Sequence, residues 1–161
     1  MGLTRAQLDK HREWFGLEKS LQAAVSGKGG KVSHLALSED WNQLPYSDDQ
    51  TLKWNLGVGK MRMAAANPLR PEEDHPAVPI FFVKKRQRGG GLCHYVGHYK
   101  CCRFDDSANA KVMFKGEPRQ ALIEFKLVEF KEDWNAKFSD IVQHLYDDEY
   151  EATEAGQGIK A

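Results

Sequence analysis

Residues 78–104 have the sequence VPIFFVKKRQRGGGLCHYVGHYKCCRF, in which two apolar runs flank a basic, glycine-rich segment. The run at 78–83 is short, partly β-branched and partly aromatic, which predicts a buried strand. The run at 92–104 predicts a second, longer strand. The loop QRGGG at 87–91 can close a hairpin between the two strands, because glycine adopts the conformations that tight turns require.

The pattern of strands and helices continues toward the C-terminus. VMF at 112–114 predicts a brief strand. ALIEFKLVEF at 121–130 predicts a third convincing strand, because Ile123, Phe125 and Leu127 alternate with charged residues. An amphipathic helix is expected next, since its apolar residues recur at helical spacing: Trp134, Phe138, Ile141, Val142 and Leu145.

The N-terminal half carries the start signals of helices. Thr4 and Gln7 have the spacing of a capping box, and the helix that they open is expected to end near residue 26, before the turn-rich SGKGGK. Ser38 can cap a second helix that Pro45 closes. Ser47 and Gln50 can open a third helix that ends at Gly57. Residues 57–76 have no clear periodicity, and the proline-rich segment 67–76 predicts an exposed loop.

This order of elements predicts an α+β fold. We expect a mainly antiparallel sheet at about 78–130 that could close into a barrel, flanked by N-terminal helices and one C-terminal amphipathic helix. Residues 1–146 are expected to form a single globular domain. Residues 147–161 are acidic and end in a glycine-rich stretch, which predicts a solvated, disordered tail.

Composition narrows the class of protein. The chain has 161 residues with 23 Lys and Arg against 23 Asp and Glu, so it is neither a strongly basic scaffold nor an acidic disordered protein. Three cysteines, two of them adjacent, do not form a secreted disulfide framework, which favours an intracellular location in the cytoplasm or nucleus. There is no apolar signal segment and no run of 18 apolar residues, so we expect a soluble protein without a membrane partner.

A basic stretch is the first candidate site. Residues 84–103 contain no Asp or Glu but hold six cations: Lys84, Lys85, Arg86, Arg88, Lys100 and Arg103. A hairpin would fold residues 84–88 back beside the middle of the next strand and create a positive patch. Cations interleaved with aromatic rings suit a nucleic-acid surface. The alternative is a solvated hairpin tip, whose charges keep the sheet edge from aggregating.

A glycine between two tyrosines is the second candidate site. On an extended strand Tyr95, Gly97 and Tyr99 share one face, and the missing side chain of Gly97 could leave a cleft in which the rings enclose or stack on a base. His98 lies within the same segment and is included among the candidate binding residues. The alternative is that both rings pack in the core and that Gly97 permits a bulge.

The cysteines and histidines at 93–102 do not have the spacing of a metal centre. Residues four apart on a strand lie roughly 13 Å from each other, which is too far for two ligands of one zinc ion. There is no CxxC pair, and buried free cysteines are the commoner arrangement. SGKGGKVS at 26–33 lacks the spacing of a phosphate-binding loop. We therefore expect no metal, no cofactor and no catalytic residues.

One family resemblance lies on the same strand. Tyr95, Gly97 and Tyr99 form a Y-x-G-x-Y pattern that resembles an uncharacterised family of fungal proteins, in which a Trp-x-x-Leu-Pro-like segment also precedes the strand. The corresponding residues here are Trp41, Leu44 and Pro45. The segment is also similar to small β-barrels of the PUA and SRA kind. This second resemblance implies a domain that reads nucleic acid or modified bases.

Three functions remain open. The leading hypothesis is a non-enzymatic recognition module for nucleic acid, in which the six cations hold phosphates while Tyr95 and Tyr99 hold a base. The first alternative is a protein-interaction domain whose basic hairpin meets an acidic partner. The second is a small enzyme that uses His94, His98 or a cysteine in a pocket beside Gly97.

Overall fold

The computed structural model describes residues 2–18, 21, 25–28, 30–38, 42–43, 51–57, 60–107, 113–114 and 116–160. The helices are α1 (Arg5–Asp9), α2 (Lys60–Ala66) and α3 (Glu132–Lys160), with 3-10 turns η1 (Asn67–Leu69) and η2 (Pro71–Glu73). The strands are β1 (Val25–Lys28), β2 (Lys31–Ser38), β3 (Asn42–Gln43), β4 (Thr51–Gly57), β5 (Val78–Lys84), β6 (Leu92–Asp105), β7 (Met113–Phe114) and β8 (Glu117–Glu129).

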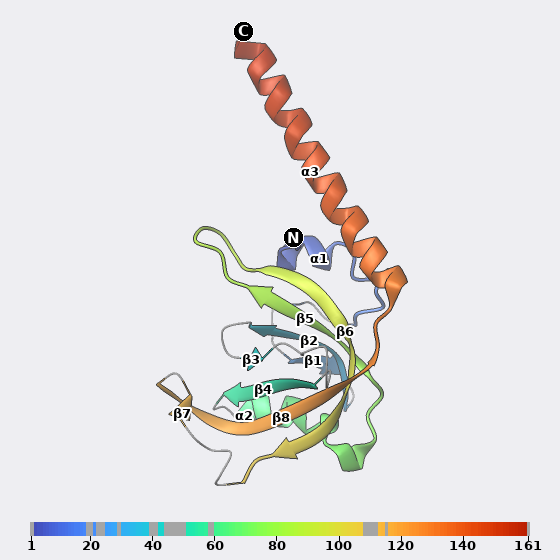
Figure 1. The fold of residues 1–161 in the computed structure, drawn as a ribbon, viewed down its shortest axis with the longest axis vertical. Coiled ribbons are helices and arrows are strands. Elements are labelled where there is room, and N and C mark those ends of the chain that lie inside the picture. Colours follow the sequence, from blue (N-terminus) through green and yellow to red (C-terminus); the bar gives the residue numbers. More distant parts are fainter. Residues whose placement is uncertain are drawn as a thin grey trace.

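One mostly antiparallel sheet organises the molecule, which confirms the α+β class (Figure 1). Its strand order is β1-β2-β5-β6-β8-β4-β3, with β7 paired to β8. Only the β2–β5 pairing is parallel among the described strands. No described pairing joins β1 to β3, so the sheet stays open and does not close into a barrel. It also starts well before residue 78, because β1 to β4 belong to it.

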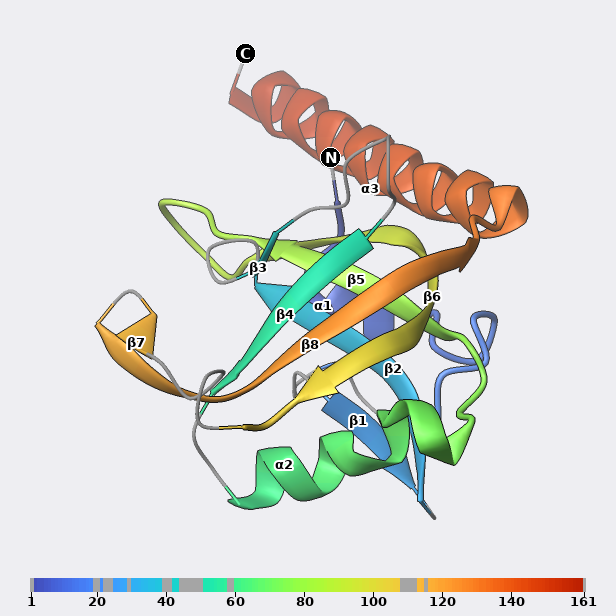
Figure 2. The ribbon, with the colours of Figure 1, turned by 60° about the horizontal axis from the view of Figure 1, so that its bottom comes forward.

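The sheet separates two hydrophobic cores. α2 and α3 lie on opposite sides of the sheet (Figure 2), and α1 lies on the side of α3 (Figure 1), where both helices share one core. We name these layers the α2 core and the α3 core. The central strand β5 serves both, since Ile80 and Phe82 enter the α2 core while Phe81 and Val83 enter the α3 core. Burial on both faces explains why this strand is a continuous apolar run without alternation.

The central hairpin was predicted correctly. β5 and β6 are antiparallel neighbours, and Lys84 pairs with Leu92 across the base of the turn. The register shifts once along this pairing, because Ile80 faces Gly97 whereas Phe81 faces Tyr95. Val96 is thus an extra residue in β6, and the strand has a bulge there.

The C-terminal helix was also predicted, but it is longer than expected. Trp134, Phe138 and Ile141 are buried in the α3 core, with Val142 and Leu145 half-buried beside them. α3 then continues to Lys160 and leaves the body of the domain (Figure 1). Residues 147–160 contain Glu and Ala, which have high helix propensity, and the expectation that residues 147–161 form a disordered tail stays a prediction.

The N-terminal half differs most from the sequence-based prediction. The capping box of Thr4 and Gln7 forms, but α1 ends at Asp9 and turns follow up to Gly16, whose φ is +67°. β1 and β2 replace the expected end of this helix and the loop after it. Ser47, the expected cap of a later helix, lies outside the described residues.

Residues 51–57 form the strand β4 where a helix was expected. Leu52, Trp54 and Leu56 are buried at every second position, which is the period of a strand with one face in the core. Conversely, α2 forms within 57–76, where no helix was expected, from the strong helix formers KMRMAAA. No helix in the described part of the chain is long and apolar enough to cross a membrane.

Candidate functional site

The tip of the β5–β6 hairpin is a cluster of solvent-exposed cations. We define the hairpin tip as residues 84–91. Its cations Lys84, Lys85, Arg86 and Arg88 are all exposed, and none takes part in an ion pair between described residues. The loop extends past the neighbouring strands in both views (Figures 1 and 2). A polyanion can therefore approach these four side chains without displacing a carboxylate.

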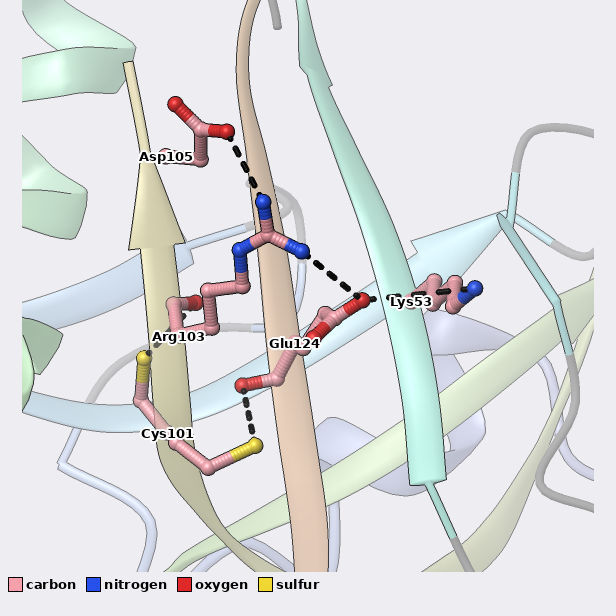
Figure 3. A network of polar contacts seen from close by, with 6 residues as sticks. Lys53, Cys101, Arg103, Asp105 and Glu124 are labelled. Carbon is pink, nitrogen blue, oxygen red and sulfur yellow. Dashed lines mark hydrogen bonds and ion pairs between the residues drawn. The ribbon is translucent and has the colours of Figure 1, made fainter. Parts of the chain in front are cut away.

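Lys100 and Arg103 have a different environment. Nζ of Lys100 lies 2.7 Å from Oδ1 of Asp74, and its hydrogen bond and charge hold the pKa of that carboxyl below its ordinary value. Arg103 contacts Asp105 at 3.2 Å and Glu124 at 3.9 Å, while Lys53 approaches Glu124 from the other side at 4.0 Å (Figure 3). These two cations are already neutralised by carboxylates.

The six predicted cations do not form one patch. Lys84 pairs with Leu92 at the start of β6 rather than with its middle, and Lys100 follows Leu92 by eight residues. At 3.3 Å per strand residue that separation is roughly 26 Å. The hairpin loop is too short to fold back along β6. The hairpin tip therefore lies apart from Lys100 and Arg103, and of the six predicted cations only the four at the tip have no ion pair to another described residue.

Tyr95 and Tyr99 do not face a common cleft. The bulge at Val96 changes the alternation of β6, so Tyr95 enters the α3 core and Tyr99 enters the α2 core. The two side chains are only 6% and 1% exposed. Gly97 has φ +137°, and a Cβ there would lie 2.5 Å from Cδ1 of Leu127. Leu127 thus fills the predicted cleft, and the bulge alternative is the correct one.

His98 belongs to a buried polar contact with Tyr95. The Tyr95 hydroxyl lies 2.6 Å from Nδ1 of His98 and accepts a hydrogen bond from the backbone N–H of Lys131 at 3.1 Å. Burial, with a smaller contribution from the charge of Lys131, lowers the pKa of His98 to about 4. Burial also raises the pKa of Tyr95 to about 12. At neutral pH this contact is therefore a hydrogen bond between a neutral phenol and a neutral imidazole.

The cysteines have the electrostatics of structural groups. Cys93 and Cys101 are buried and free, as predicted, while Cys102 is exposed. Burial raises the pKa of both Cys93 and Cys101 to about 11 and also raises that of Cys102. A nucleophilic cysteine needs a lowered pKa to be a thiolate at neutral pH. These shifts do not favour the small-enzyme alternative.

The described residues contain no cluster of three or more His, Cys, Asp or Glu side chains that could hold a metal ion. The cysteines of β6 also fall on different sides of the sheet. Cys93 packs in the α3 core and Cys101 in the α2 core, whereas Sγ of Cys102 reaches the carbonyl of Glu124. Their separation follows from strand pleating and from the bulges of β6.

No protein-family model, curated protein or solved structure matches this chain. The resemblance to the fungal family and to PUA- and SRA-like barrels therefore stays a prediction. Trp41, Leu44 and Pro45, which carried part of it, lie outside the described residues.

Sequence reasoning missed one feature of the hairpin tip. Nε of Arg86 donates to the carbonyl of Gly90 at 2.7 Å, so this cation also closes the loop. The signal in the sequence was the pair of Arg86 with the three glycines that follow, because a glycine-rich turn leaves its carbonyls open to a nearby guanidinium.

Proposed function

We propose that the protein is a non-enzymatic recognition module that binds the phosphate backbone of duplex nucleic acid through the hairpin tip. The observation that carries this proposal is the exposure of Lys84, Lys85, Arg86 and Arg88 with no carboxylate partner among the described residues. Cations that contact phosphates release condensed counterions, and this release drives sequence-independent binding. The zero net charge of the chain confines the attraction to this local cluster.

Two features favour a duplex over a single strand. Residues 84–91 contain no aromatic side chain, and the rings of Tyr95 and Tyr99 are buried, so the tip offers no stacking platform for unpaired bases. A two-stranded ribbon, in contrast, fits the major groove of a DNA duplex. Contacts to phosphates position such a ribbon without reading sequence. An intracellular location, in the cytoplasm or nucleus, fits this proposal.

Fluorescence anisotropy with a labelled duplex of about 20 base pairs, measured across a salt titration, tests the proposal. Three or four phosphate contacts predict a slope of log affinity against log salt of about −3. Lys85→Glu with Arg88→Glu should weaken binding to all duplex sequences alike and flatten this slope by about 2. The single strand of the same sequence should bind more weakly than the duplex.

The matched control reverses two exposed cations elsewhere. Lys31→Glu with Lys126→Glu changes the net charge by the same amount but leaves the hairpin tip intact. Equal losses in both double variants would show that only net charge matters. No duplex binding by the wild-type chain at about 50 mM salt would refute the proposal. Saturable binding of an acidic peptide in its place would then favour the protein-interaction alternative.

A further inference from the structure

A hydrogen bond between Arg86 and Gly90 closes the turn of the hairpin tip, and we call this contact the lock. Arg86 and Gly90 are joined by the 2.7 Å hydrogen bond between Nε and the carbonyl oxygen, which spans the turn. Gly89 lies within the turn that this hydrogen bond closes and has φ +79°, a left-handed conformation that favours glycine. A Cβ at Gly89 would lie 2.9 Å from Nη2 of Arg86, so the guanidinium occupies the space that a larger residue would need.

We infer that Arg86 is a positioning residue, whereas Lys84, Lys85 and Arg88 are the side chains that contact phosphates. This inference rests on the proposed function. The Nε donor of Arg86 already has an acceptor in the loop, so its side chain is held against the turn. The side chains of Lys84, Lys85 and Arg88 make no hydrogen bond to another described residue, and these three cations are exposed to solvent.

The physical consequence is preorganisation. A glycine-rich loop has high conformational entropy when it is free, and a ligand that orders it loses affinity. The Arg86 bridge restricts the loop before any ligand arrives, so the three remaining cations are presented on a formed turn. Lysine at position 86 would keep the charge but lose the planar donor that suits the Gly90 carbonyl.

The lock can be tested without any ligand. In the free protein, the Nε–H of Arg86 should exchange with water more slowly than the Nε–H of Arg88, which serves as an internal control in the same loop. Equal exchange rates for the two groups in nitrogen-detected or proton-detected NMR spectra would overturn the lock. This outcome does not depend on whether the hairpin tip binds nucleic acid.

Its effect on binding is tested with two variants that keep the charge of the tip. Arg86→Lys and Gly89→Ala should each weaken duplex binding by about 3- to 10-fold and leave the salt slope unchanged. Gly30→Ala is the matched control, because Gly30 has φ +77° in another turn with open space around its Cβ position. It should bind like the wild type.

The outcomes separate the two proposals. If the wild type binds no duplex while Arg86 Nε–H is protected, the proposed function fails and the lock stands. If the wild type binds and both charge-keeping variants bind equally well, the positioning role of Arg86 is wrong. A salt slope flattened by about 1 in Arg86→Gln would also contradict it, since the loss of one released counterion would identify Arg86 as a phosphate contact.

Discussion

The hydroxyl of Tyr95 lies 2.6 Å from Nδ1 of His98, and both side chains are almost fully buried. The same hydroxyl accepts the backbone N–H of Lys131, one residue before α3 begins. Trp134 of α3 packs edge-on against the His98 ring, with 4.6 Å between ring centroids. This contact therefore fastens the start of α3 to strand β6, on the side of the sheet away from α2.

Acid should weaken the fold through His98. Its pKa is about 4 in the folded protein, against an ordinary value of 6.5, so between these pH values the unfolded chain binds a proton that the folded chain does not. The free energy of unfolding should therefore fall as the pH drops from 6.5 toward 4, by at most about 3 kcal/mol. Asp133 opposes this shift and Lys131 reinforces it.

Urea unfolding of wild type and His98→Gln at pH 7 and pH 4.5 checks this prediction. The variant lacks the imidazole, so its stability should depend less on pH than that of the wild type. Identical pH dependence in both proteins would mean that His98 does not titrate as its burial implies.

Trp134 should be the main anchor of α3. Its ring is 9% exposed and contacts Phe15, Phe81 and Tyr95 in the α3 core. Trp134→Ala should lower the free energy of unfolding by about 3–5 kcal/mol, as large aromatic truncations in cores do. Trp14→Ala is the control, because Trp14 is 48% exposed and should cost less than about 1 kcal/mol. A wild-type melting temperature for Trp134→Ala would show that Trp134 does not anchor α3 in the core.

Gly97→Ala should be destabilising through two independent effects. The backbone φ of +137° is strained for any L side chain, and the new Cβ would meet Leu127 at 2.5 Å and Tyr99 at 3.2 Å. Together these effects predict a loss of at least about 2 kcal/mol in chemical denaturation. Gly116→Ala, at φ +81° with open space around it, should show only the backbone effect. Equal losses in the two variants would argue against close packing at the bulge.

The acidic end of the chain should compete with nucleic acid for the hairpin tip. Removing residues 147–161 should change the free energy of unfolding by less than about 0.5 kcal/mol, because the described apolar contacts of α3 end at Leu145. It should tighten duplex binding at low salt, and screening should abolish the difference at high salt. A full-length variant with its five acids made neutral should behave alike: Asp147, Asp148, Glu149, Glu151 and Glu154. Unchanged duplex affinity in both variants would show that the acidic end does not compete with nucleic acid for the hairpin tip.

The elements that could be predicted are those whose local pattern agrees with their tertiary environment. The apolar run of β5, the glycines after it and the helical stripe of α3 each indicate one structure. Residues 51–57 carry a conflict, because a capping pattern precedes them while Leu52, Trp54 and Leu56 alternate. The pairing of β4 with β8 decides for a strand, and the segment itself contains no information about that partner.

The candidate site was predictable in part for similar reasons. The exposure of the hairpin tip follows from its own charges and glycines. The neutralisation of Lys100 and Arg103 depends on Asp74 and Glu124, which are distant in the sequence. The faces of Tyr95 and Tyr99 were assigned wrongly because one inserted residue reverses the period-two count. Gly97 indicated that a bulge could occur, but not that the rings would enter different cores.

An NMR titration of the full chain with duplex DNA at about 50 mM salt tests most directly whether the hairpin tip contacts nucleic acid. The account predicts amide shift changes that are largest at residues 84–91 and small at Lys100, Arg103 and the buried tyrosines. Shift changes centred on the sheet face around Lys100 and Lys126, or no changes at saturating duplex, would contradict it.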